Sequence, residues 1–374
     1  MNDRSAVVKN TWVRIFSVLW HAVLSDARLH DQPPPVKIAF SDRLSSKRGA
    51  RIRPFVLEVS TQFALDLHNE LGSVQDALAG LAFSTPSLRR AHRGKVLAAI
   101  EELTIGFVLL HELFHLIGGH LDWYDARRAN GLKVDGQQLC LQLTSSKRHG
   151  GQGAPTYRST ADAYLLECEA DCSAIQWIVQ AMPQSKLRRL LRTQAASMTS
   201  FPQPQRLAAF RLLLASVWLV IRRLESGKEK LVRNSSETHP LPVTRVFAGF
   251  GTLIREYSCI SDLRYDAQGG GQRTLTNSDV ISMREFLERV LKPVLTSDWN
   301  PGSPHLPAES LEAQMRFYLH DFGNHMLNRP VQTIAGHELL RMERARFRMD
   351  RGLRPFRYYQ AVELKRMKAA RKQV

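Results

Sequence analysis

The chain is organised around the sequence HELFH, residues 111–115. It lies within residues 101–120, where apolar residues recur at a helical spacing and proline is absent. On a helix, residues four apart share one face, so His111 and His115 can both direct a ring nitrogen at one point. Glu112 can reach a water molecule held at that point. Two imidazoles beside a carboxylate are the arrangement that a hydrolytic zinc site requires.

The five-residue pattern alone leaves a second interpretation open, a core helix that carries two hydrogen-bonded histidines. The assignment therefore depends on a third ligand. A catalytic zinc takes three protein ligands and keeps one position open for water. His120 is the weaker candidate, because nine residues beyond His111 on a continued helix it would face the opposite side.

Glu167 is the better third ligand. It lies in a predicted helix among apolar residues, where a buried carboxylate requires a charged partner or a metal. Asp171 follows one turn later on the same face, where it can accept the spare N–H of a ligating histidine. The alternative is a surface cluster of carboxylates, and Glu169 fits that description.

The composition is that of a globular protein. Of 374 residues, 44% are hydrophobic and 23% are charged, which is enough apolar material for a buried core and excludes disorder throughout. The formal net charge is +17. Nucleic acid, an anionic membrane surface or an acidic protein partner would suit this charge, and so would a basic surface that is merely solvated.

The sequence favours a cytoplasmic protein without a transmembrane segment. Residues 1–10 lack the features of a signal peptide. The best membrane candidate, residues 207–221, contains only ten consecutive uncharged residues at 212–221, whereas a span needs about 20. We expect a buried core helix there. No disulfide scaffold is expected from the four cysteines, which lie at positions 140, 168, 172 and 259.

The expected fold class is α+β and mostly α, with a small sheet and an active-site helix. Short strands are expected at 36–40 and 55–59, with polar loops at 41–53 and 84–94. Besides the central helix at 101–120, helical spacing or capping predicts helices at 5–24, 61–71, 73–83, 159–182, 204–225, 243–257, 280–291, 308–327 and 334–349.

The glycine-rich polar residues 261–278 suggest a linker between two parts of the chain. We expect a catalytic domain over 1–260, the linker, and a helical, basic C-terminal region over 279–374. Within the first domain, residues 132–143 could form a hairpin. Residues 145–158 form a glycine-rich loop, either a lid near the site or an ordinary insertion.

Three motifs in order resemble the gluzincin metallopeptidases of the HtpX and CAAX-prenyl-protease type. The first is HELFH with a histidine at position 120, and the second is Glu167-x-x-Ala170-Asp171. The third is THPLPVTR at residues 238–245, which carries a His-Pro pair and an arginine six residues after that histidine. The resemblance covers roughly residues 36–260, where the predicted strand and helix before the active-site helix also agree.

This resemblance implies a zincin-like core and a zinc endopeptidase whose substrate is a protein or peptide. His111, His115 and Glu167 would bind the zinc, and Glu112 would activate its water. The resemblance further implies that His239 stabilises the oxyanion of the tetrahedral intermediate and that Arg245 holds its segment in place.

The sequence departs from that family in lacking its transmembrane helices, and residues 276–374 have no counterpart in it. A soluble relative is therefore indicated. The Lit-type phage-exclusion peptidases, which are also soluble HExxH proteins, are a looser resemblance. It would imply a role in phage defence or a stress response.

Two other functions fit parts of the sequence. A protease that acts on nucleic-acid-bound proteins, like the SprT type, would explain the charge, but its third ligand is a more distant histidine and Glu167 would have no role. A nucleic-acid-binding protein with a structural zinc is the other alternative. Structural sites are usually closed by four ligands, often cysteines, and no suitable cysteine set is present.

The C-terminal residues 337–374 are strongly basic. Twelve lysines or arginines against four acidic residues give this segment +8, and Phe347, Phe356, Tyr358 and Tyr359 are interleaved with them. Such a mixture can grip phosphates and stack on bases, or dock an acidic protein. It is also compatible with a solvated helix face. We expect this segment to recruit nucleic acid or an acidic partner without taking part in the zinc chemistry.

Overall fold

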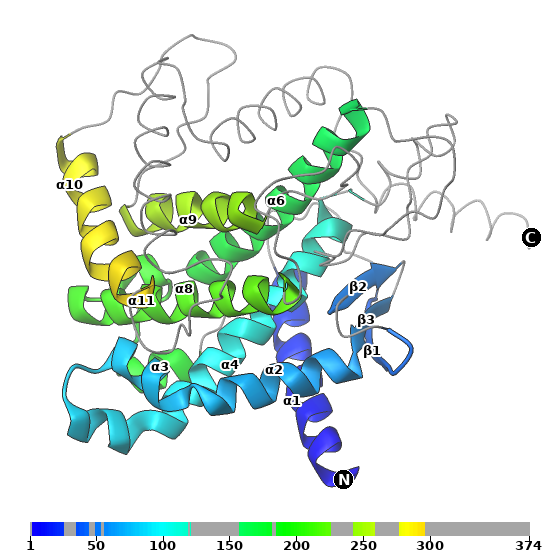
Figure 1. Ribbon diagram of the computed structural model, residues 1–374, viewed down its shortest axis with the longest axis horizontal. Coiled ribbons are helices and arrows are strands. Elements are labelled where there is room, and N and C mark those ends of the chain that lie inside the picture. The colour runs from blue at the N-terminus through cyan, green and yellow to red at the C-terminus, as the bar shows by residue number, and fades with distance from the viewer. Residues whose placement is uncertain are drawn as a thin grey trace, which may run out of the picture.

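The computed structural model describes residues 2–25, 35–44, 49–53, 56–118, 120, 157–181, 185–225, 242–258 and 277–295. These residues form a mostly helical protein with one small mixed sheet (Figure 1). The sheet lies at one end, and the last described helices lie at the other. This confirms the expected α+β, mostly α class.

The helical elements follow one another along most of the described chain. They are α1 (Asn2–Leu24), α2 (Thr61–Ser73), α3 (Gln75–Ala82), α4 (Pro86–Ile117), α6 (Tyr157–Gln180), α7 (Ser185–Leu191), the 3-10 turn η2 (Met198–Ser200), α8 (Gln203–Glu225), α9 (Pro242–Ser258), α10 (Asn277–Phe286), the π-helical turn η3 (Leu287–Leu291) and α11 (Lys292–Leu295). Expected helices that coincide with these elements agree with them within a few residues at each end, apart from the start of α4.

Helix α4 is the centre of the fold. Nearly every residue from 99 to 116 is buried, and the helix contacts α1, α2, α3, α6, α7, α8, β2 and β3. A helix that is apolar on all sides belongs in a core. The predicted loop at 84–94 is wrong, because α4 already begins at Pro86, a residue favoured in a first helical turn. Its basic residues form the exposed start of the helix.

The sheet contains β1 (Lys37–Ser41), β2 (Ala50–Arg53) and β3 (Val56–Ser60). Strand β3 is central, parallel to β1 and antiparallel to β2. The two predicted strands are confirmed within one residue at each end. Strand β2 was predicted as loop, because its two arginines make the segment look polar. In the structure Ala50 and Ile52 are buried, and Arg51 pairs with Glu58.

The end of β3 leads directly into α2. Ser60 caps that helix, its Oγ accepting a hydrogen bond from the Phe63 N–H at 3.3 Å. Strands β2 and β3 both contact α4. The sheet is therefore held beside the helix that carries the histidine pair.

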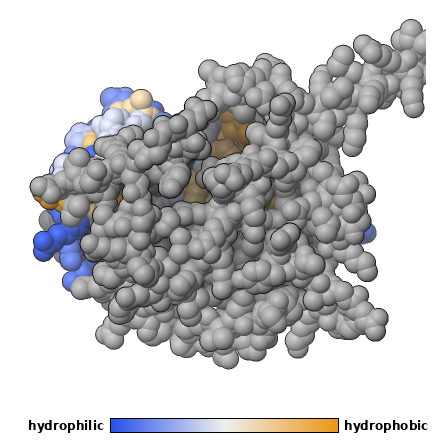
Figure 2. All heavy atoms as spheres, turned by 90° about the horizontal axis from the view of Figure 1, so that it is seen from above, coloured by the Kyte–Doolittle hydropathy of each residue, from blue (hydrophilic) through white to orange (hydrophobic). Residues whose placement is uncertain are grey.

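Helix α8 is a core helix, as expected. Residues 203–221 are long and apolar enough to cross a membrane by composition, and most of them are buried inside the protein. The helix contacts α3, α4, α7 and α9. Figure 2, the view from above, shows hydrophilic residues mainly at the left edge and apolar residues near the centre.

The last described segment, residues 277–295, packs on α8 and α9. Pro293 has no N–H to give to the Arg289 carbonyl four residues earlier, and the chain forms the π-helical turn η3 just before it. Arg211 of α8 supplies the missing donor, its Nε lying 2.6 Å from that carbonyl oxygen. This bond ties η3 to the core.

Several predictions fall outside the described residues. They are the hairpin at 132–143, residues 145–156 of the predicted loop, whose last two residues already belong to α6, the helices at 308–327 and 334–349, and the basic segment 337–374. The proposed domain division at 261–278 also stays a prediction.

Candidate metal centre

The C-terminal end of α4 presents the two histidines of the HELFH sequence on one face. His111 and His115 are both fully buried, and their Nε2 atoms lie 3.1 Å apart. Their rings meet edge to face, with centroids 4.7 Å apart. The helical spacing therefore produces the convergence of ring nitrogens that it predicts.

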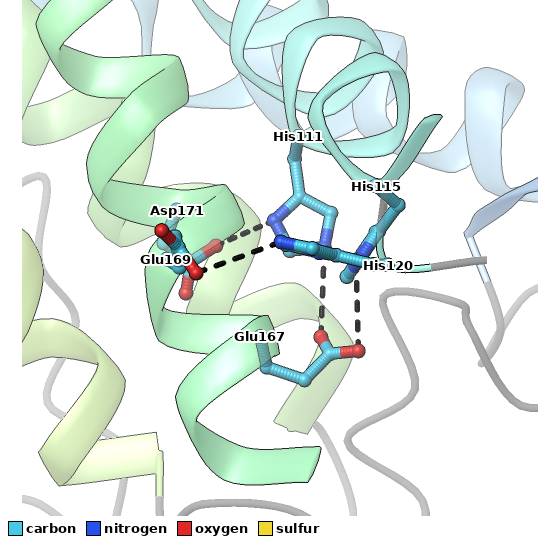
Figure 3. Close-up of polar contacts among 6 residues, drawn as sticks. All are labelled: His111, His115, His120, Glu167, Glu169 and Asp171. Atoms are coloured by element: carbon cyan, nitrogen blue, oxygen red, sulfur yellow. Dashed lines mark hydrogen bonds and ion pairs between the residues drawn. The ribbon is translucent and has the colours of Figure 1, made fainter. Parts of the chain in front are cut away.

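Helix α6 supplies a carboxylate to the same point (Figure 3). Glu167 Oε2 lies 3.5 Å from His111 Nε2, and Glu167 Oε1 lies 3.6 Å from His115 Nε2. Glu167 is buried, because α6 packs against α4 along this stretch. The three residues offer ligand atoms that all lie within 4.8 Å of one another. They form a group that could hold a metal ion.

These separations fit a small divalent cation. Zinc binds imidazole nitrogens and carboxylate oxygens at about 2.0–2.2 Å, so two ligands of a tetrahedral site lie about 3.3–3.5 Å apart. The three measured separations of 3.1, 3.5 and 3.6 Å bracket that value. The donor set of two imidazoles and one carboxylate is also one that catalytic zinc accepts.

Asp171 lies behind His111. Its Oδ1 is 2.8 Å from His111 Nδ1, so the proton on that nitrogen is held there and Nε2 is left facing the candidate metal position. Burial alone would lower the pKa of His111, but the negative charges of Asp171 and Glu167 outweigh it and raise that pKa to about 9. Without a metal, His111 is therefore an imidazolium at neutral pH, with a proton on each ring nitrogen.

His120 lies closer to the centre than the sequence predicted. Helix α4 ends at Ile117, so the expectation that His120 would face away on a continued helix is wrong. The chain turns at Gly118, and the buried His120 places its Nδ1 2.9 Å from His115 Nδ1. His120 thus contacts a candidate ligand from behind and is not part of the group that could hold the ion.

Glu112 is fully buried on α4, next to His111. A carboxylate buried at this depth is costly unless charge or hydrogen bonds compensate it. Glu102, the other buried glutamate on the described part of α4, shows such compensation, since it accepts a hydrogen bond from the Lys186 backbone N–H at 3.2 Å. Burial raises the pKa of Glu102. The role of Glu112 as a general base stays a prediction.

The remaining predicted site residues are not placed at the centre by the described structure. His239 lies outside the described residues, and Arg245 lies in α9 with its side chain outside the described part. Their predicted roles stay predictions. The residue whose contact was missed is His120, and the Gly118-Gly119 pair is the signal that the helix stops before it.

Comparison with known proteins adds no relative. No family model, no curated protein and no solved structure matches this chain. The similarity to gluzincin metallopeptidases therefore rests on the motifs themselves and on the buried His111, His115 and Glu167 group, which is consistent with a zincin-like site.

Proposed function

We propose that the protein is a zinc-dependent endopeptidase of the gluzincin type. The observation that carries the proposal is the buried group of His111, His115 and Glu167, whose ligand atoms lie within 4.8 Å of one another. Glu112, which is fully buried and follows His111 in the sequence, would serve as the base. This is the combination of ligands and base that metal-assisted hydrolysis requires.

Zinc at this position would supply a Lewis acid and lower the pKa of a water molecule. The protein residues do the rest. His111 and His115 would hold the metal through their Nε2 atoms, while Asp171 orients the His111 ring from behind. Glu112 accepts the proton of the attacking water and passes it to the leaving amine. By resemblance to the family, His239 stabilises the oxyanion and Arg245 positions that segment.

The sheet supports a peptide substrate. Strand β2 forms an edge of the described sheet and contacts α4, the helix of the histidine pair. An extended peptide can pair with such an edge through backbone hydrogen bonds. The peptide bond to be cut would then run beside the end of α4.

The test compares new protein N-termini in cells that express the wild-type chain or Glu112→Gln. The substitution keeps the side-chain shape and removes the base. Glu102→Gln is the matched control, since it alters another buried glutamate of α4 whose acceptor role glutamine can keep. We expect new N-termini with wild type and Glu102→Gln and none with Glu112→Gln. Identical N-termini for all three proteins would contradict the peptidase.

A further inference from the structure

A chain of contacts leads away from His115 to the surface. His115 Nδ1 lies 2.9 Å from His120 Nδ1, and the two rings are 5.0 Å apart, nearly edge to face. On its other side, His120 Nε2 lies 3.6 Å from Glu169 Oε2. Figure 3 shows His120 between His115 and the acidic residues of α6. Glu169 is 42% exposed, whereas both histidines are buried.

Gly118 leaves the space that this contact needs. A Cβ atom added at Gly118 would lie 2.8 Å from His120 Nε2 and 2.8 Å from the Phe114 carbonyl oxygen. Side-chain atoms do not approach that closely, so any larger residue would push the His120 ring away. The glycine that ends α4 is thus also the residue over which His120 folds back.

We propose that His120 is a positioning residue that fixes the ring of His115 for metal binding. The inference rests on the metal site of the proposed function and not on peptide hydrolysis. His120 Nδ1 accepts a hydrogen bond from the His115 Nδ1–H. This keeps the proton off His115 Nε2, the nitrogen that faces His111 and Glu167.

Only one direction of this hydrogen bond is compatible with the site. If His120 donated from Nδ1, His115 would carry its proton on Nε2 and could not bind a metal there. In the required direction, His120 carries its own proton on Nε2. Glu169 favours that tautomer, because its negative charge lies 3.6 Å from Nε2, which is beyond hydrogen-bond range but close enough to attract the N–H.

The arrangement behind His115 then resembles the arrangement behind His111. His111 is oriented by Asp171 and His115 by His120, which Glu169 supports in turn. Helix α6 therefore contributes three carboxylates, each with a different role at the centre. Glu167 faces the candidate metal position, and Asp171 and Glu169 stand behind the two imidazoles.

The hydrogen bond itself can be observed by nitrogen NMR of the full chain, labelled with ¹⁵N-histidine and loaded with Zn²⁺. His120→Asn identifies the His120 signals by their loss. We expect His120 to show an unprotonated Nδ1 and a protonated Nε2. A His120 that is protonated at Nδ1 cannot accept the bond and would overturn the proposal, whatever the variants do.

Metal affinity provides the second readout, measured by competition with a chromophoric chelator for Zn²⁺. His120→Ala should weaken binding about ten- to a hundred-fold, the usual effect of losing a partner of a metal ligand. Asparagine places an oxygen where Nδ1 was and should restore most of the affinity. Gln, whose amide extends farther, should restore less. Gly118→Ala keeps His120 in the sequence but should weaken binding, because the added Cβ pushes the His120 ring away from His115.

His92→Asn is the matched control, because His92 lies on the same helix about 28 Å from His111, with its ring tilted against that of Phe83. It should leave zinc affinity unchanged. Equal affinity of wild type and a folded His120→Ala would overturn the proposal. These measurements do not depend on proteolysis, so a protein that binds zinc through His120-oriented His115 but cuts no peptide would contradict only the proposed function.

Discussion

Two polar clusters in this protein are built on opposite rules. The metal cluster comprises His111, His115, Glu167 and Asp171. The tyrosine cluster comprises Gln203, Arg206, Tyr257, Glu285 and Arg289, where α8, α9 and α10 meet with η3. The side chains of the metal cluster are buried, whereas in the tyrosine cluster Tyr257 is buried and Gln203 and Arg289 are exposed. The clusters differ in how donors and acceptors are matched.

In the tyrosine cluster, donors face acceptors. The Gln203 amide donates to Glu285 at 2.7 Å and to the Tyr257 hydroxyl at 3.2 Å, and Arg289 pairs with Glu285 at 2.9 Å. Arg206 lies over the Tyr257 ring, 4.6 Å from its centroid. Burial and the neighbouring Glu285 raise the pKa of Tyr257 to about 12, so its hydroxyl keeps its proton. This cluster is complete without a ligand.

In the metal cluster, acceptors face acceptors. Once Asp171 and His120 hold the Nδ1 protons, the Nε2 lone pairs of His111 and His115 point at each other and at Glu167. A cation resolves this conflict, either a proton on His111 or a metal ion. The comparison teaches that unmatched acceptors mark a ligand site, whereas a cluster whose donors and acceptors are matched needs no ligand.

The largest effect should come from Glu112→Gln. The rate of cleavage of a substrate found by N-terminal sequencing should fall about 10²–10⁴-fold, because the general base is lost. The zinc content should not change. Glu102→Gln should cleave at nearly the wild-type rate. An undiminished rate in Glu112→Gln would remove Glu112 from the chemistry.

Asp171→Ala should weaken zinc binding about ten- to a hundred-fold, since His111 loses the group that orients its ring. Chelator competition measures the change. Glu285→Ala, which removes the acid of the tyrosine cluster, should leave zinc affinity as it is. If both substitutions had the same effect on zinc, the distinction between the clusters would fail.

Zinc affinity should rise with pH. Below the His111 pKa of about 9, the metal must displace a proton, so apparent affinity should increase about tenfold per pH unit from pH 7 and level off above pH 9. Calorimetry at pH 7 in buffers of different ionisation heat should show release of about one proton from this histidine. Asp171→Asn removes a negative charge and should move the plateau to lower pH. Affinity that is flat between pH 7 and 9 would contradict an imidazolium at His111.

The smallest effect should come from Tyr257→Phe. Loss of one buried hydroxyl and its hydrogen bond should lower the free energy of unfolding by about 0.5–1.5 kcal/mol, measured by urea denaturation. Zinc affinity should not change, because the tyrosine cluster is structural. A loss of zinc in this variant would show that the two clusters are coupled.

The sequence predicted the parts of the site that depend on regular helices. The four-residue spacing of His111 and His115 determines their shared face, and Glu167 was recognisable as an acidic residue inside an apolar helix pattern. Two of the three strands of the small sheet were predicted, because β1 and β3 have mainly apolar sequences, whereas β2 contains two arginines.

The sequence did not predict features at the ends of regular elements or in very short ones. The position of His120 follows from the turn at Gly118, and helical periodicity carries no information beyond a helix end. The start of α4 at Pro86 was hidden by its basic first turns, which resemble a polar loop. Strand β2 is only four residues long and contains two arginines, one balanced by Glu58 on the next strand, a pairing that a linear sequence does not show.

The central claim is that His111, His115 and Glu167 hold one zinc ion. The most direct test is the zinc content of wild type, Glu167→Ala and His120→Ala, each equilibrated with buffered zinc well above the wild-type dissociation constant. We predict about one zinc per chain for wild type and for His120→Ala, and none for Glu167→Ala. A zinc-loaded Glu167→Ala together with an empty His120→Ala would contradict the claim.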